Sequence, residues 1–325
     1  MENSPILEVN NLEVQFPTRE GTVSAVHKLS FHVNAGEIVG LVGESGCGKT
    51  TAALALMRLV PKPGKITGGS IRIGAKEITQ LSENEMRAMR GPAVAMVFQD
   101  ALTALDPRMT VGNQILEPLQ IQMHLSPSQA RARAIELLTQ VGIPSAASRL
   151  KQYPHEFSGG MRQRAMIALA LSCSPRVLLA DEPTTALDVT MQNQILNLIQ
   201  DLKSQTGSAV VLITHDVGVV AKVCDRVVVM YAGREVEFGP TERVFTHPVH
   251  PYTRGLLEST LMLDGDRSKP LQAIPGLPPE LINLPTGCVF YPRCKFKSDV
   301  CQEQQPELET IEREHMAACW NWRPS

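Results

Sequence analysis

A glycine-rich segment between two apolar runs constrains the fold of this chain more than any other feature. Residues 43–51 read Gly-Glu-Ser-Gly-Cys-Gly-Lys-Thr-Thr, after the apolar run 38–42 and before the apolar run 52–57. A buried strand, a loop with this spacing of glycine, lysine and threonine, and a helix together form a phosphate-binding P-loop. The sequence therefore predicts an α/β fold of the P-loop NTPase class.

Each part of this loop suits an anionic ligand. Glycines allow backbone angles that a side chain forbids, so successive amide groups can point at phosphate oxygens. The helix that follows directs its positive dipole end at the same anion. Lys49 offers a charge to the β- and γ-phosphates, and Thr50 offers a hydroxyl to Mg²⁺. The residues expected to bind the nucleotide here are Gly43, Glu44, Ser45, Gly46, Cys47, Gly48, Lys49, Thr50 and Thr51.

Two carboxylates follow another apolar run, at residues 177–180. A buried parallel strand presents its first polar residue at its carboxyl end, where ligands bind in α/β folds. We expect Asp181 to bind Mg²⁺ and Glu182 to orient the attacking water or take its proton. The alternative is a pair of acids on a solvated loop.

Three further residues have two interpretations each. Gln99 ends the expected strand 94–99 and could reach a metal or a water. His215 ends the expected strand 210–215 and could sense a γ-phosphate. Each is otherwise an ordinary strand terminus. Phe16, upstream of the loop, could stack on an adenine ring or belong to the core.

The chain has a helical middle and a proline-rich end. Apolar positions have helical spacing at 117–123, 128–141 and 161–172, which predicts a helical insertion at about 103–172. Within it, Ser158 suits a helix N-cap, and Gly159 and Gly160 expose backbone amides. Prolines recur after residue 240. We therefore expect one domain at 1–240 and a small loop-rich module at 241–325.

Taken in their order along the chain, from the P-loop through Gln99, Ser158 and Asp181 to His215, the motifs resemble those of the ATP-binding subunit of ABC transporters. The resemblance covers roughly residues 6–260. The resemblance implies an ATPase core with an antiparallel β subdomain and a helical subdomain. It also implies that ATP lies between the P-loop of one subunit and the signature loop of another. The implied roles are catalytic base for Glu182, Q-loop for Gln99, switch histidine for His215, signature loop for Ser158, Gly159 and Gly160, D-loop for 186–188 with Asp188, and adenine stacking for Phe16.

Two departures from that pattern are visible. Residues 157–161 read Phe-Ser-Gly-Gly-Met where Leu-Ser-Gly-Gly-Gln is common, which spares the serine and both glycines. We expect function to survive this change. Cys47 stands where a small polar residue is usual, and our hypothesis is that it makes ATP binding sensitive to thiol reagents.

A narrower resemblance comes from residues 247–253 and the proline- and cysteine-rich tail, which look like those of oligopeptide and dipeptide importer ATPases. This implies a subunit that hydrolyses ATP to power peptide import. The implied partners are a second ATPase subunit, identical or homologous, two membrane-spanning permease subunits and, indirectly, an extracytoplasmic binding protein. The alternatives are an importer ATPase for another cargo, such as nickel complexes, and a non-transport ABC ATPase with a redox-sensing tail.

Four cysteines crowd into residues 288–325: Cys288, Cys294, Cys301 and Cys319. In a cytosolic chain such a cluster indicates a metal site more readily than disulfides. The spacing is not the C-x2-C pairing of structural zinc. Four thiolates can hold a [4Fe–4S] cluster or Zn²⁺. Irregular spacing favours the cluster, which the importer resemblance also implies; Zn²⁺ and unliganded or disulfide-bonded cysteines stay open.

Composition limits the remaining functional classes. The 325 residues carry a net charge of -2, which lacks the basic footprint of a nucleic-acid binder. No apolar run reaches the length of a membrane span, and the first residues do not resemble a signal peptide. We expect a peripheral protein at the cytoplasmic face of the cell (inner) membrane, bound there through a partner.

Overall fold

The computed structural model describes residues 5–184, 188–261 and 274–322. The chain divides into two compact units. The helical unit comprises Met1–Leu7, Asn34–Glu37 and Ile73–Val211, and the P-loop unit comprises Glu8–Val33, Ile38–Arg72 and Leu212–Ser325.

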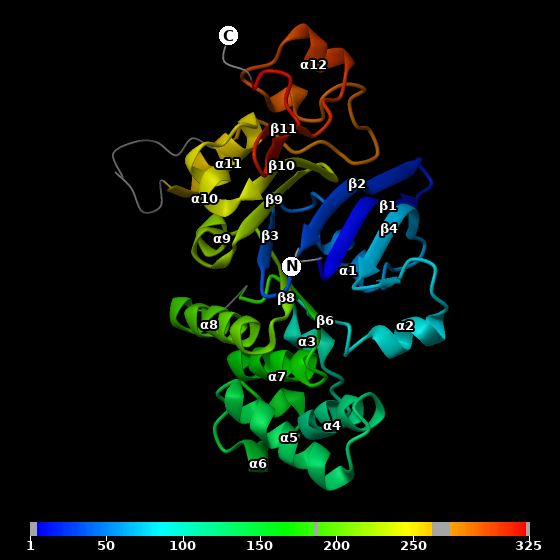
Figure 1. Cartoon of the computed structure of the whole chain (residues 1–325), viewed down its shortest axis with the longest axis vertical. Coiled ribbons are helices and arrows are strands. Elements are labelled where there is room, and N and C mark those ends of the chain that lie inside the picture. Colours follow the sequence, from blue (N-terminus) through cyan, green and yellow to red (C-terminus); the bar gives the residue numbers. More distant parts are fainter. Residues whose placement is uncertain (1–4, 185–187, 262–273, 323–325) are drawn as a thin grey trace. The chain divides into compact units, whose positions relative to one another are not determined.

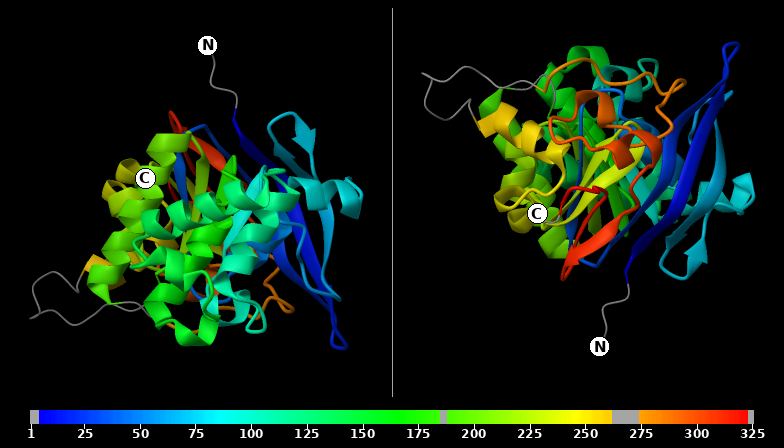
Figure 2. Two further views of the ribbon diagram at one scale, coloured as in Figure 1. Left: turned by 90° about the horizontal axis from the view of Figure 1, so that it is seen from below. Right: turned by 90° about the horizontal axis from the view of Figure 1, so that it is seen from above.

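A sheet of long strands begins the P-loop unit, with β2 (Thr22–Val33), β1 (Leu7–Pro17) and β4 (Lys65–Ile73) side by side in that order. β1 and β2 are the two long blue strands in Figures 1 and 2. Apolar residues at alternate positions of β1 are buried, as expected of a strand with one face on the core.

A second sheet in the P-loop unit holds the glycine loop. β3 (Ile38–Val42), buried along its whole length, runs parallel to β9 (Arg226–Tyr231). β9 turns back into β10 (Arg234–Pro240) through Ala232 and Gly233, whose φ angles are both positive, as a two-residue hairpin requires. Around this sheet lie α1 (Lys49–Leu56), α9 (Val217–Val223), α10 (Thr241–Thr246) and α11 (Pro251–Leu261).

The tail contains more regular structure than the sequence predicts. β12 (His315–Ala317) pairs antiparallel with β10, and β11 (Glu309–Glu312) pairs with β12. The red tail strands lie beside β10 in Figure 1. Pro251 is the first residue of α11, a position that tolerates proline, so the prolines do not exclude helix here. Short α12 (Asp299–Glu303) and the 3-10 turn η2 (Tyr291–Arg293) complete the tail. The proposed boundary near residue 240 stays a prediction, and the tail shares one compact unit with the P-loop.

The helical unit contains parallel strands and most of the helices. β6 (Val94–Val97) runs parallel to β7 (Val177–Asp181), and β8 (Ala209–Thr214) follows β7 in the sheet; β8 ends in the P-loop unit. α4, α5 and α7 pack on one another, shown in green in Figure 1. The elements of this unit are β5 (Lys76–Glu77), α2 (Glu83–Met89), α3 (Ala101–Ala104), α4 (Val111–Ile121), α5 (Pro127–Gln140), α6 (Ala146–Arg149), η1 (Pro154–Glu156), α7 (Gly159–Leu171) and α8 (Val189–Thr206).

Local signals in the sequence explain where these helices begin and end. Ser82 and Glu85 form a capping box at the start of α2, and Ser126 and Gln129 begin α5 in the same way. Gly207 ends α8 in the left-handed conformation, with φ 66°. The α/β class, the β subdomain and the helical insertion are therefore confirmed. Within the described ranges, no helix is long and apolar enough to cross a membrane.

Candidate functional site

Glycine is required at two positions of the P-loop. Gly43 and Gly48 have φ angles of 156° and 103°. A Cβ on Gly43 would lie 2.2 Å from the carbonyl oxygen of Met230, and one on Gly48 would lie 2.2 Å from that of Ala25. Both contacts are with backbone oxygen atoms, which cannot move aside as the end of a flexible side chain can. The loop therefore keeps its shape only without side chains at these positions.

Lys49, the first residue of α1, lies across this loop. Its side chain is buried, and Nζ donates hydrogen bonds to the carbonyl oxygens of Gly43 at 2.7 Å and Glu44 at 2.9 Å. Gly48 is the N-cap and has no side chain to occupy the first amides of the helix. The loop thus presents an ammonium group and a helix start together, which is the chemistry of a phosphate site.

Cys47 is less accessible than its place in the loop suggests. Only 5% of the residue is exposed, and burial raises the pKa of its thiol although nearby Lys49 lowers it. Its carbonyl oxygen accepts a hydrogen bond from the Gly233 amide at 2.9 Å, in the β9–β10 turn. A buried, protonated thiol reacts slowly, which argues against the expected sensitivity to thiol reagents. In contrast, Ser45, Gly46 and Thr50 are exposed, and Thr51 is half-buried.

Two of the expected catalytic residues meet in the helical unit. Asp181 ends β7 with 1% of its surface exposed, and Glu182 follows it. Gln99 Nε2, two residues beyond β6, donates a hydrogen bond to Glu182 Oε2 at 2.9 Å. This contact follows from the fold, because β6 and β7 run parallel and end at the same edge.

The backbone at Glu182 is strained. Its φ angle is 44°, a region that residues with a Cβ adopt at a cost of about 1–3 kcal/mol. Such strain gathers at functional sites, where the surrounding structure holds a side chain in one orientation. The position is consistent with a catalytic carboxylate, and the sequence offered no sign of it.

The expected signature loop begins α7. Ser158 caps the helix, with Oγ accepting a hydrogen bond from the Met161 amide at 3.3 Å. Gly159 and Gly160 form its first turn. Ser158 and Gly159 are exposed, and a Cβ on Gly159 would find no atom within 4 Å in this chain. The start of α7 is therefore open to an outside ligand.

A side chain outside the sequence motifs connects α7 to the segment that follows the two carboxylates. Buried Gln163 donates through Nε2 to the carbonyl oxygen of Pro183 at 2.7 Å. Pro183 directly follows Glu182, so α7 supports the loop that carries the carboxylate expected to be catalytic. The sequence gives little sign of this role, because Gln163 stands between Arg162 and Arg164 and resembles one more polar residue of a solvated turn.

The other predicted residues lie at ends of elements. Asp188 caps α8 by accepting a hydrogen bond from the Met191 amide at 2.9 Å, and the preceding D-loop residues 186–187 lie outside the described residues. His215 is exposed just after β8. Phe16 is half-buried, and its ring lies against the backbone of Gly64. Both interpretations of Phe16 stay open.

The tail cysteines lie near enough to influence one another electrostatically. Burial, first of all, raises the pKa of Cys288 and of Cys319 to about 11, and neighbouring thiols add to this. Backbone amides two residues further on donate to the sulfurs of Cys288, Cys294 and Cys319; the Cys294 bond is 3.4 Å. No three His, Cys, Asp or Glu side chains of the described residues are arranged to hold a metal ion.

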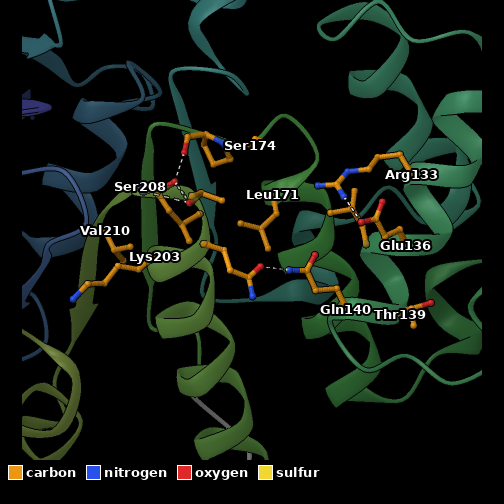
Figure 3. A pocket seen from close by; sticks show the side chains of 14 residues that line it. Arg133, Glu136, Thr139, Gln140, Leu171, Ser174, Lys203, Ser208 and Val210 are labelled. Atoms are coloured by element: carbon orange, nitrogen blue, oxygen red, sulfur yellow. Dashed lines mark hydrogen bonds and ion pairs between the residues drawn. The ribbon is translucent and has the colours of Figure 1, made fainter.

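A cavity of roughly 570 Å³ lies elsewhere in the helical unit (Figure 3). Arg133, Glu136 and Gln140 of α5 line one side, and Lys203 of α8 and Ser208 line the other. None of the residues expected to bind nucleotide contributes to it. The cavity is therefore distinct from the P-loop and from the carboxylate edge.

The comparisons with known proteins agree with this arrangement. The family described as "ABC transporter" matches residues 26–185, and the family described as "Oligopeptide/dipeptide transporter, C-terminal region" matches residues 236–301. A relative from Haemophilus influenzae, "Oligopeptide transport ATP-binding protein OppD", is 48% identical over 98% of this chain and 97% of its own length. The chain belongs to the ABC transporter family of ATPases.

A second relative by sequence and a solved structure agree with this family assignment. "Probable peptide ABC transporter ATP-binding protein y4tR" from Sinorhizobium fredii is 50% identical over 97% of this chain and 94% of its own length. The structure "Dimeric Structure of MJ0796, a Bacterial ABC Transporter Cassette" matches with a TM-score of 0.66 and 28% identity, over 72% of this chain and 98% of that one. As an ABC ATPase, this chain binds ATP with Mg²⁺. The family's ATPases act as dimers with membrane permease subunits.

Proposed function

We propose that this chain is the ATP-hydrolysing subunit that powers import of dipeptides or oligopeptides by a multi-subunit ABC transporter. The observation that carries the proposal is similarity along nearly the whole chain, tail included, to proteins named for oligopeptide transport. A chain that shared only the ATPase core would support no particular cargo.

In the proposed mechanism, the P-loop amides and Lys49 bind the β- and γ-phosphates. Glu182, held by Gln99, orients the attacking water and takes its proton. Thr50, Asp181 and Gln99 supply oxygen atoms of the type that Mg²⁺ prefers, and the ion would neutralise charge on the phosphates. His215 contacts the γ-phosphate, and Phe16 stacks on the adenine.

The second half of the site comes from a partner ATPase. Ser158, Gly159 and Gly160 bind the nucleotide held by the partner's P-loop, and Asp188 lies at the same junction. This assignment is supported by the exposure of the α7 start and by the empty space around Gly159. Closure of the dimer around ATP would drive the permease subunits, and hydrolysis would reopen it.

The test of hydrolysis is Glu182→Gln. A glutamine cannot accept the proton, so steady-state turnover should fall at least about 100-fold while ATP stays bound. Glu136→Gln makes the same chemical change on exposed α5 and should leave turnover unchanged. Turnover near the wild-type rate in Glu182→Gln would refute the assigned role.

The proposed role in peptide import is tested separately from ATP hydrolysis. The chain should copurify with two polytopic membrane subunits and associate with the cytoplasmic face of the cell membrane through them. Cells lacking the chain should lose uptake of a labelled peptide but retain uptake of nickel. Loss of nickel uptake alone would support the alternative cargo, and absence of membrane partners would support a non-transport ATPase with a redox-sensing tail.

We also propose that Cys288, Cys294, Cys301 and Cys319 ligate a [4Fe–4S] cluster, with Zn²⁺ as the alternative. Because no three of these described side chains are arranged as metal ligands in the structure, binding would have to bring their sulfurs together. Amide donors at three of the sulfurs support ligation, because such hydrogen bonds stabilise bound thiolates. Protein purified without oxygen should contain about four irons and four acid-labile sulfides per chain. One zinc without iron would support the alternative, and neither metal would contradict both.

A further inference from the structure

Glu44, the second residue of the P-loop, is held by two residues from the distant tail. The guanidinium of Arg293 donates from Nη1 to Oε2 at 2.6 Å and from Nη2 to Oε1 at 3.0 Å. The backbone amide of Glu44 donates to the hydroxyl oxygen of Tyr252 at 2.8 Å. Side chain and backbone of one loop residue are thus both fixed by residues beyond position 240.

Arg293 is itself rigidly placed. Its side chain is 5% exposed, and Nε donates to the carbonyl oxygen of Pro275 at 2.9 Å. Nη1 lies 3.4 Å from the Tyr231 hydroxyl, and Nη2 lies 3.4 Å from the carbonyl oxygen of Ile274. A two-point ion pair with a fixed, buried guanidinium restricts orientation as well as distance. The tail therefore sets where the Glu44 carboxylate lies.

Tyr252 is fixed by aromatic packing. It is fully buried, and its ring centroid lies 4.7 Å from that of Tyr231 and 5.6 Å from that of Phe290. Tyr231 ends β9, and Phe290 belongs to the tail. The hydroxyl that receives the Glu44 amide consequently has little freedom to move.

These contacts bear directly on the phosphate-binding lysine. The carbonyl oxygen of Glu44 accepts a hydrogen bond from Lys49 Nζ at 2.9 Å, so the residue that the tail holds also holds the lysine. A shift of Glu44 would move the loop entrance and one anchor of Lys49 together. Displacements of an ångström at such positions have large effects on ligand binding and rate.

We infer that Arg293 and Tyr252 are positioning residues for the P-loop, and that the C-terminal region thereby determines the affinity of this ATPase for ATP. The inference deepens the proposed function and rests on its assignment of ATP to the P-loop. It assigns to the tail a part in nucleotide binding, in addition to any metal the cysteines bind.

Tyr252→Phe is the mildest test, because it keeps the buried ring and removes only the acceptor of the Glu44 amide. The Kd for Mg–ATP of the full chain should rise about tenfold. Tyr291→Phe is the matched control, since that tail hydroxyl donates to Gln302 at 3.3 Å and does not contact the loop. It should leave the Kd unchanged.

Arg293→Gln tests the second contact. It should raise the KM for ATP about tenfold with kcat changed less than about twofold, the pattern of lost binding rather than lost chemistry. Arg243→Gln is its control, because Arg243 pairs with Glu312 within the tail and sheet and does not touch the P-loop. The double variant Arg293→Gln with Glu44→Gln should lose less ATP-binding free energy than the sum of the losses in the two single variants. The reason is that both substitutions break the same contact.

Thermal unfolding of each variant separates positioning from stability. If Arg293→Gln and Tyr252→Phe lower the Tm but leave Kd and KM for ATP unchanged, the inference is wrong and these residues only stabilise the tail. Lys49→Ala distinguishes this from failure of the proposed function. If Lys49→Ala binds ATP normally, then the nucleotide assignment fails first.

Discussion

Accessibility, rather than position in a motif, determines how single residues of the P-loop react. Cys47 lies among residues expected to bind phosphate, yet burial raises the pKa of its thiol and excludes solvent. Its neighbours Ser45 and Gly46 are exposed. The Cys47 sulfur instead packs inward, 3.7 Å from Lys49 Nζ.

We therefore predict that ATP binding survives brief treatment with a maleimide. The thiolate is the reactive species, and little of it forms in a buried thiol with a raised pKa. ATP affinity would be measured before and after treatment, with Cys47→Ser as the control. Rapid loss of binding in the wild type, but not in Cys47→Ser, would restore the hypothesis of a sensitive cysteine.

A second prediction at this scale concerns Gly48→Ala. The new Cβ would clash with the Ala25 carbonyl oxygen and would also force alanine to φ 103°, so ATP binding should be lost and stability should fall by about 3 kcal/mol or more. Gly36→Ala is the control, since φ there is 64° but no atom lies within 4 Å. It should cost about 1 kcal/mol. Equal denaturation midpoints for the two variants would contradict the clash.

At the scale of elements, buried Glu237 of β10 joins two parts of the tail. Its carboxylate accepts the amides of Val249 and His250 at 2.8 and 2.9 Å, and His315 Nε2 of β12 lies at 2.8 Å. The hydrogen bond to Glu237 raises the pKa of His315. In contrast, burial lowers the pKa of His250 to about 4, and its Nδ1 accepts the Tyr252 amide.

The lowered pKa of His250 predicts an acid-sensitive junction. The folded state keeps this ring neutral, so its contribution is complete above pH 6.5 and is lost as pH falls toward 4, by roughly 3 kcal/mol. His250→Asn keeps an acceptor and should flatten the decline in unfolding free energy over that range. Exposed His247→Asn should keep the wild-type slope. An unchanged slope in His250→Asn would show that other groups govern acid sensitivity.

Elements with local signals were predictable from the sequence, and contacts between distant segments were not. The strand, loop and helix around Lys49 depend on neighbouring residues, and they are confirmed. β11 and β12 are short, and β11 is mostly exposed, so neither gives an alternating pattern. The pair of Glu44 and Arg293 joins residues 249 positions apart, and only tertiary packing brings them together.

At the scale of the whole molecule, the divided site implies assembly. In the proposed mechanism the P-loop of one chain and the signature loop of another bind one nucleotide, and a similar cassette is known as a dimer. Glu182→Gln protein should therefore double in mass when ATP is added, because ATP joins the chains and is not hydrolysed. Light scattering would measure this, with ADP as the control ligand.

Ser158→Arg in the Glu182→Gln background tests which surface makes that dimer. Arginine at the exposed start of α7 would occupy the space next to Gly159 that the partner's nucleotide needs, so ATP should still bind but the mass should not change. Arg133→Glu on α5 alters charge outside the predicted junction and should permit dimers. Dimers that form with ATP despite Ser158→Arg would place the interface elsewhere. If Glu182→Gln protein alone binds ATP but stays monomeric, then the partner is a different, homologous ATPase.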